Sequence, residues 1–303
     1  MNPAPDRVPA GTTPGAPRLT LSQLVGLLVY TLRESLYRWT LITYVLGITF
    51  FLLLLATAVN LDIVEGTLAS ARLFGQDLEI GDMGIRVTDV VRTFQVVVIT
   101  LLYVVGVALA LFLAANHIPS IAREGWADLL LAQPISRTTL LLGRALGSLA
   151  VVGLGVAYLV AGSWVVLRWK TGFGSAGFLL AGLVILFAFA ACYTATMLVG
   201  IVTGNGPVAG MIGLFVWVAG HVIYPFHRFP EWRAALDSGW PRQLAVALSE
   251  GLYWLLPKNQ GLGQLAVGAA RGESLSMEPV LYSLPFMGLC LLLACWWFAR
   301  RDY

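Results

Sequence analysis

Long stretches without any ionised side chain dominate the hydropathy pattern of this chain. They run from Trp39 to Leu61, Thr93 to Ala122, Ala145 to Leu167, Thr171 to His227 and Pro279 to Ala299. A helix needs about 20 apolar residues to cross a bilayer, and a charge near the bilayer centre is costly. Each stretch therefore predicts at least one transmembrane helix.

The fourth stretch is too long for a single span. Its 57 residues would form a helix about 85 Å long, whereas the hydrocarbon core of a bilayer is about 30 Å thick. The cluster Thr203-Gly204-Asn205-Gly206-Pro207 breaks it, because glycine permits positive φ and proline removes a backbone donor. The pattern thus predicts six transmembrane helices, near residues 39–60, 93–116, 140–167, 177–202, 207–226 and 280–298.

Two segments precede the first predicted span. Residues 1–18 hold five prolines, two arginines and no apolar run, which predicts a disordered tail rather than a cleavable signal peptide. Thr20 and Gln23 then match a capping box. Leucines follow at helical spacing on one side and polar residues on the other, which is typical of an amphipathic helix in the membrane interface. The alternative is that this segment only extends the first span.

A second amphipathic segment lies between spans five and six. Residues 243–256 place leucines and alanines on one helical side and Glu250 on another, with Trp240, Tyr253 and Trp254 nearby. The segment is too short to span, so we expect it to rest on or dip into the outer surface, with its aromatic rings at headgroup level. A soluble loop is the alternative.

Composition agrees with a membrane protein. The chain is 58% hydrophobic and only 12% charged, against about 25% charged in soluble domains, and its mean hydropathy is +0.80. These values exclude a typical water-soluble enzyme, and a net charge of +3 is too small to indicate a nucleic-acid binder. The three cysteines lie in apolar runs and predict neither a disulfide framework nor a zinc cluster. The expected fold class is an all-α polytopic membrane protein.

Six spans place both termini on one side of the membrane. With the termini inside, the basic residues divide almost equally between the two sides, so their number does not decide the orientation. Local charge favours a cytoplasmic location for both ends, because Arg33 and Arg38 flank the first span while Asp62 and Glu65 follow it.

The predicted inner loop between spans two and three has the most informative pattern. Pro119 can open a short helix, Gly125 and Pro134 can end helical segments, and Ser136 can cap the start of span three. The result is a short amphipathic helix parallel to the membrane. Its polar side carries Arg123, Glu124 and Asp128, and its apolar side carries Ile121, Trp126, Leu129 and Leu130.

At these residues the chain resembles the permease subunits of ABC-2 type ABC transporters. In that family a pattern close to I-x-x-E-x-x-x-G-T-L-x-x-L-L-x-x-P-I-S-R-x-x-x-L-x-G-K-x-x-G follows the second span. The residues that stand where this pattern would place them are Leu129, Leu130, Pro134, Ile135, Ser136, Arg137, Leu141, Gly143, Arg144 and Gly147. Trp126-Ala127-Asp128 replaces the family's Gly-Thr-Leu, and Arg144 replaces its lysine. The motif covers residues 118–147, while the helical layout matches over nearly the whole length.

The resemblance implies that residues 19–303 form a single ABC-2 type transmembrane domain. It also implies that residues 118–130 form a coupling helix seated on a separate ATPase, with Ile121, Arg123, Glu124, Trp126, Asp128 and Leu129 as the contact residues. Two ATPase chains would supply ATP and Mg, and a second permease copy or a similar subunit would complete the pathway. The implied location is the inner, cytoplasmic membrane, and the implied activity is export of a hydrophobic or amphiphilic substrate.

Motifs for other chemistry are missing from the sequence. There is no G-x-x-x-x-G-K-[ST] phosphate loop, H-E-x-x-H or G-x-S-x-G, so we expect no catalytic residues and no cofactor on this chain. His117, His221 and His227 are too scattered to predict a metal site. In the fifth span Trp217, His221 and Tyr224 could line a translocation path, although an aromatic belt would explain Trp217 and Tyr224 equally well.

Two other functions stay open. The chain could be a membrane scaffold or mechanical transmitter that an ATPase drives without any cargo, because that function also needs a coupling helix. A secondary carrier is less favoured, because the spans lack the acidic residues and the repeated halves that such carriers use.

Overall fold

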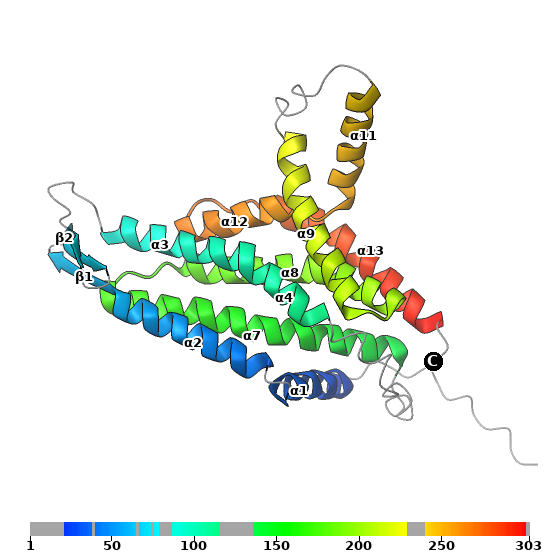
Figure 1. Cartoon of the computed structure of the whole chain (residues 1–303), viewed down its shortest axis with the longest axis horizontal. Coiled ribbons are helices and arrows are strands. Elements are labelled where there is room, and N and C mark those ends of the chain that lie inside the picture. The colour runs from blue at the N-terminus through cyan, green and yellow to red at the C-terminus, as the bar shows by residue number, and fades with distance from the viewer. Residues whose placement is uncertain are drawn as a thin grey trace, which may run out of the picture.

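The structure is a computed structural model, and it describes residues 21–37, 40–64, 67–73, 76–78, 87–115, 136–228 and 240–300. These residues are predominantly helical (Figure 1). The elements are α1 (Leu21–Tyr37), α2 (Thr40–Ala58), β1 (Val59–Val64), β2 (Thr67–Leu73), β3 (Gln76–Leu78), α3 (Val87–Leu101), the π-helical turn η1 (Leu102–Gly106), α4 (Val107–Ala115), α7 (Arg137–Thr171), α8 (Ala176–Thr203), α9 (Gly206–Arg228), α11 (Trp240–Leu255), α12 (Asn259–Arg271) and α13 (Glu278–Arg300).

Five helices in the described ranges are long and apolar enough to cross a membrane. They cover Thr88–Ala115, Arg137–Thr171, Ala176–Thr203, Gly206–Pro225 and Glu278–Arg300. The prediction of a helical, multi-pass membrane protein is therefore confirmed, with five of the six expected spans present by length and composition. In the region of the first predicted span, α2 contributes a shorter apolar helix, Val45–Thr57.

Helices α7 and α8 run antiparallel along the length of the bundle and define its two ends, whereas α9 crosses their direction steeply (Figure 1). We call the end where α7 begins the proximal end; there Arg137 Nη1 donates to the carbonyl of Ala299, near the C-terminus of α13. We call the opposite end, where α7 turns into α8, the distal end. The sheet and the start of α3 also lie at the distal end in Figure 1, whereas α1 lies toward the proximal end.

Capping residues set the limits of the spans as their chemistry requires. The Ser136 hydroxyl accepts a hydrogen bond from the backbone N–H of Thr139 at 3.1 Å, which confirms Ser136 as the N-cap of α7. Gly172 and Gly204 end α7 and α8 with φ of 73° and 65°, a left-handed conformation that favours glycine. The break predicted after Thr203 is confirmed, because α9 starts only two residues beyond Gly204.

A small antiparallel sheet, β1-β2-β3, follows α2 at the distal end. These strands were not part of the all-α fold that we expected from the sequence. Apolar and polar residues alternate through much of β1 and β2, a period-two pattern that fits strands. Because charged residues interrupt the segment, its sequence also resembles that of a polar loop.

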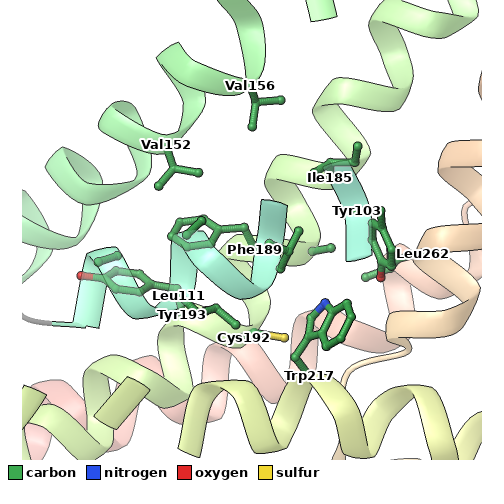
Figure 2. Packing of buried hydrophobic residues seen from close by; sticks show 14 of the residues in the cluster. Tyr103, Leu111, Val152, Val156, Ile185, Phe189, Cys192, Tyr193, Trp217 and Leu262 are labelled. Carbon is green, nitrogen blue, oxygen red and sulfur yellow. The ribbon is translucent and has the colours of Figure 1, made fainter. Parts of the chain in front are cut away.

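The core forms around α8, which lies at the centre of the helix packing (Figure 2). Phe178, Ile185, Phe189 and Met197 along α8 are almost fully buried. Figure 2 shows Tyr103, Cys192, Trp217 and Leu262 converging from four different elements. The outer surface of the bundle is also apolar, as a membrane-embedded protein requires. Its exposed side chains include Leu46, Phe50, Leu109, Leu183, Phe215, Val222 and Leu292.

Helix α12 starts inside the bundle and does not cross it. Its first residue, Asn259, is fully buried against the middle of the α3–α4 span and of α9. Its end lies at the distal end, because a Cβ on Gly177, in the first turn of α8, would clash with the carbonyl of Ala269. At 13 residues α12 is about 20 Å long, which is too short to span and fits a half-crossing.

Candidate functional site

The predicted coupling contacts Ile121, Arg123, Glu124, Trp126, Asp128 and Leu129 lie outside the described residues, as do Thr20 and the tail 1–18. The second half of the same motif is described, since it forms the first turns of α7. We call the contact between these turns and α1 the α1–α7 junction. It consists of Gly143, Arg144 and Gly147 on α7 and Leu27, Thr31 and Glu34 on α1.

The two motif glycines let α1 lie directly against α7. A Cβ on Gly143 would come within 2.7 Å of the Leu27 Cβ, and one on Gly147 would come 2.5 Å from the Thr31 Cβ. Real Cβ atoms do not approach other carbons so closely, so any side chain at these positions would push the helices apart. The Gly143-x-x-x-Gly147 repeat therefore serves helix packing within this chain.

Arg144 lies between the two glycines and fixes the junction electrostatically. Its side chain is only 3% exposed, its Nη1 donates to Glu34 Oε2, and its guanidinium lies 5.0 Å from the centre of the Tyr30 ring. Its backbone carbonyl accepts a hydrogen bond from Ser148, whose hydroxyl in turn accepts one from Tyr193 on α8 at 3.0 Å. The junction is thus joined to the central helix of the bundle.

This arrangement can transmit a displacement. An interhelical ion pair buried beside two close backbone contacts resists sliding of α1 along α7, so the two helices would move together. The junction also follows directly after residues 116–135, the segment that contains the predicted coupling helix.

The three predicted path residues occupy different surroundings. Trp217 is 8% exposed and packs against Tyr103 and His221, with ring centroids 6.3 and 4.2 Å away. His221 hydrogen-bonds through Nδ1 to the carbonyl of Trp217 at 2.8 Å. Tyr224, one turn further along α9, lines a cavity. The structure brings Trp217 and His221 together in the core and separates Tyr224 from them; a role of all three in a path stays a prediction.

Asn259 ties the beginning of α12 to three spans. Its side-chain Nδ2 donates to the carbonyls of Val216 and Trp217 at 3.3 and 3.1 Å. Its backbone carbonyl accepts a hydrogen bond from the Tyr103 hydroxyl. The thiol of Cys192 lies 3.6 Å from its Oδ1. Tyr103 belongs to η1, so the π-helical turn carries the hydroxyl that reaches α12.

The residue before Asn259 faces a cavity, which we call the distal cavity. Its volume is about 250 Å³, and it lies between α9, α11, α12, the loop after α12 and the start of α13. Polar and charged groups make up much of its wall. They are Tyr224, Tyr253, Lys258, Gln264, Glu273, Ser274, Ser276, Glu278 and Tyr282.

Lys258 is the buried charge of the distal cavity. The residue is 4% exposed, and its Nζ has no hydrogen-bond partner among the described residues. The ammonium lies 3.5 Å from the centroid of the Tyr253 ring and 5.6 Å from that of Trp254. Burial lowers the pKa of Lys258 from 10.5 to about 8, because low-polarity surroundings disfavour the charged form. At pH 7 the side chain is still mainly protonated.

Lys258 was not among the residues predicted from the sequence to form a site. A signal was available, because Lys170 and Lys258 are the only lysines in the chain, and Lys258 follows an apolar stretch that ends in Pro257. An isolated ionisable residue in such a stretch is a reason to expect a functional site. Elsewhere in the described ranges, no group of three His, Cys, Asp or Glu side chains is placed to hold a metal ion.

Comparison with known families places most of the chain in one family. Residues 76–303 match the family described as a protein of unknown function (DUF2705). The match covers well over half of the chain, which therefore belongs to the DUF2705 family. It includes both the α7 half of the junction and the whole distal cavity. No curated protein matches the chain.

Proposed function

We propose that this chain is the membrane-spanning permease subunit of an ABC-2 type ATP-driven transporter, most simply an exporter of a hydrophobic or amphiphilic substrate. The observation that carries the proposal is the α1–α7 junction. Three positions of the motif that resembles the ABC-2 permeases, Gly143, Arg144 and Gly147, meet α1 in one packed, charge-paired contact. Such a contact suits a part that receives a push and passes it to the spans.

The proposal assigns roles to the segments on either side of the junction. Residues 118–130 form the coupling helix on the ATPase, α1 lies in the interface, and α2 completes a sixth span. With six spans both termini lie in the cytoplasm, so the proximal end faces the ATPase. The distal end, with the sheet and the end of the half-crossing α12, then faces outward.

Energy comes from the partner subunits in this mechanism. ATP and Mg bind two ATPase chains, whose closure moves each coupling helix. Because α1 and α7 are joined at Arg144 and the glycines, the displacement reaches α7 as a nearly rigid-body motion. A second permease copy or a similar subunit supplies the other half of the path.

Charge reversal in the coupling helix tests the proposal directly. The full chain is purified in mild detergent from cells that also produce its native partners, and the ATPase that remains bound is identified and quantified. Glu124→Lys and Asp128→Lys should each reduce the retained ATPase about tenfold, which corresponds to roughly 1.4 kcal/mol of binding. Stimulated ATP hydrolysis should fall in parallel.

Asp89→Lys is the matched control, because Asp89 is an exposed acid at the distal end. This variant should retain the ATPase fully. Absence of any ATPase from the wild-type preparation, or full retention by both coupling-helix variants, would refute the proposal. Substrate-stimulated hydrolysis by the intact complex would support transport over a role without cargo.

A further inference from the structure

The distal cavity holds a buried cation that the bundle leaves without an anion. The Lys258 ammonium has three donors, and neither a hydrogen bond nor an ion pair with a described residue uses them. Its backbone N–H donates to Ser283 of α13 at 3.0 Å, so the residue is held in place. A fixed, buried and unpaired ammonium at a cavity wall is suited to receive an anionic group from a ligand.

The opposite part of the wall has the other sign of charge. Glu278, the first residue of α13, is exposed and lines the cavity together with Glu273. Glu273 lies 3.6 Å from Arg271 on the surface, whereas Glu278 forms no ion pair with another described residue. A ligand with an anion alone would be repelled by these carboxylates, whereas a ligand with an anion and an ammonium would match both signs.

The cavity lies where a candidate membrane span begins. Glu278, in its wall, is the first residue of α13, and α13 is long and apolar enough to cross a membrane. The ends of such a helix lie at the level of the lipid headgroups. From the cavity, exposed Leu281 and Leu284 continue along α13 toward the proximal end and offer an apolar surface to an acyl chain.

The size of the cavity limits what it can enclose. Its volume of about 250 Å³ is below the roughly 300–1,000 Å³ of pockets that bury a whole drug-sized ligand. The cavity therefore suits a headgroup rather than a complete amphiphile. Three tyrosines, Tyr224, Tyr253 and Tyr282, add hydroxyls for a phosphate and ring faces for an ammonium.

We propose that the distal cavity binds the headgroup of a zwitterionic amphiphile, with its phosphate or carboxylate at Lys258 and its ammonium at Glu278. This inference is independent of the proposed function, because binding requires no ATPase. The bilayer is the source of the amphiphile, since the cavity lies at the start of a helix that is long enough to span a membrane, beside the exposed apolar surface of that helix. A soluble zwitterion would share the same chemistry but would gain nothing from Leu281 and Leu284.

Native mass spectrometry of the full chain in maltoside detergent tests the inference. Dioleoyl phosphatidylethanolamine, the phosphatidylglycerol with the same chains and dioleoylglycerol are titrated separately. The zwitterionic lipid should bind with a dissociation constant about tenfold below those of the other two, because only it satisfies both charges. Equal affinities, or tighter binding of phosphatidylglycerol, would overturn the proposal, and this comparison needs no variant.

Variants then locate the site. Lys258→Met should raise the dissociation constant for phosphatidylethanolamine about tenfold, whereas Lys170→Met, at the other lysine of the chain, should leave it unchanged. Glu278→Gln, at an exposed position, should weaken the binding of the zwitterionic lipid and strengthen the binding of phosphatidylglycerol. Unchanged binding by both Lys258→Met and Glu278→Gln would place the lipid elsewhere and overturn the assignment.

A competition arm separates the two sources of the headgroup. Soluble phosphoethanolamine is added to the lipid-bound chain. Failure of millimolar phosphoethanolamine to displace the lipid supports the membrane source, because the acyl chains then contribute to affinity. Displacement with an affinity equal to that of the lipid would overturn the membrane source.

Discussion

Arg144 and Lys258 are both buried cations, but the bundle treats them differently. Arg144, at the α1–α7 junction, pairs with Glu34 and touches Tyr30, and two glycines bring its helices together. Lys258, in the distal cavity, lies near two aromatic rings and is paired with no carboxylate of the described residues. Burying a charge is tolerated when a partner compensates for the lost water. The charge of Arg144 is therefore paired within this chain, whereas we infer that the charge of Lys258 is paired by a ligand.

The largest expected effect comes from making Arg144 resemble Lys258. Glu34→Gln removes the carboxylate and leaves the arginine buried without its anion, which should lower the free energy of unfolding by about 3 kcal/mol. The measurement is the unfolding midpoint of the purified chain in detergent.

Glu273→Gln is the matched control for Glu34→Gln. Its partner Arg271 is 51% exposed and Glu273 is 58% exposed, so the same substitution should cost less than about 1 kcal/mol. Equal losses in the two variants would mean that the buried pair is not what holds the junction.

Packing at the junction should give the next largest effect. Gly147→Ala places a Cβ against Thr31, so α1 must shift, at an expected cost of about 2 kcal/mol. Gly26→Ala is the control within α1, where an added Cβ meets nothing within 4 Å. It should stabilise the helix by roughly 0.5–1 kcal/mol. If Gly147→Ala leaves the free energy of unfolding unchanged, α1 and α7 can separate at little cost.

Removing the charge of Lys258 should raise the free energy of unfolding, whereas breaking the Arg144 pair should lower it. Without ligand, Lys258→Met relieves an uncompensated buried ammonium and loses its contact with the Tyr253 ring, so we expect a net gain of about 1 kcal/mol at pH 7. Lys170→Met should change stability less. The check is the same detergent unfolding; a large loss in Lys258→Met would mean that the ammonium already has its partner.

The spans could be predicted from the sequence, but the α1–α7 junction and the distal cavity could not. Charge-free length is a local property, so the break at Gly204 and the cap at Ser136 could be predicted from neighbouring residues. To predict the junction, one would have to know that Glu34 pairs with Arg144, 110 residues away. No local pattern encodes which helix will approach the two glycines.

The distal cavity shows the same limit more strongly. Its wall combines Tyr224, Lys258 and Glu278 from three separate elements, and only the half-crossing of α12 brings them together. The predicted path residues illustrate the consequence. Trp217, His221 and Tyr224 share one helix in sequence, yet Asn259 packs beside Trp217, while Tyr224 faces the cavity.

The smallest expected effect is a pH dependence that reports the missing anion. Burial lowers the pKa of Lys258 to about 8 from 10.5, so between these values the unfolded chain binds more protons than the folded chain. Stability without ligand should therefore rise with pH across this window, by no more than the roughly 1 kcal/mol that we expect from removing the charge in Lys258→Met. Lys258→Met should lack the rise.

The other titratable and charged groups around Lys258 set the conditions for this measurement. They are Tyr224 from α9, Tyr253 from α11, Arg271 and Glu273 at the end of α12, and Glu278 and Tyr282 from α13. The comparison between wild type and Lys258→Met is made from about pH 7.5 to about pH 9.5, a range around the pKa of Lys258 of about 8. A bound headgroup anion should reverse the slope, since it favours the protonated lysine and is lost as the pH rises. An identical pH profile in the two proteins would mean that Lys258 is already neutral or already paired, and its contrast with Arg144 would disappear.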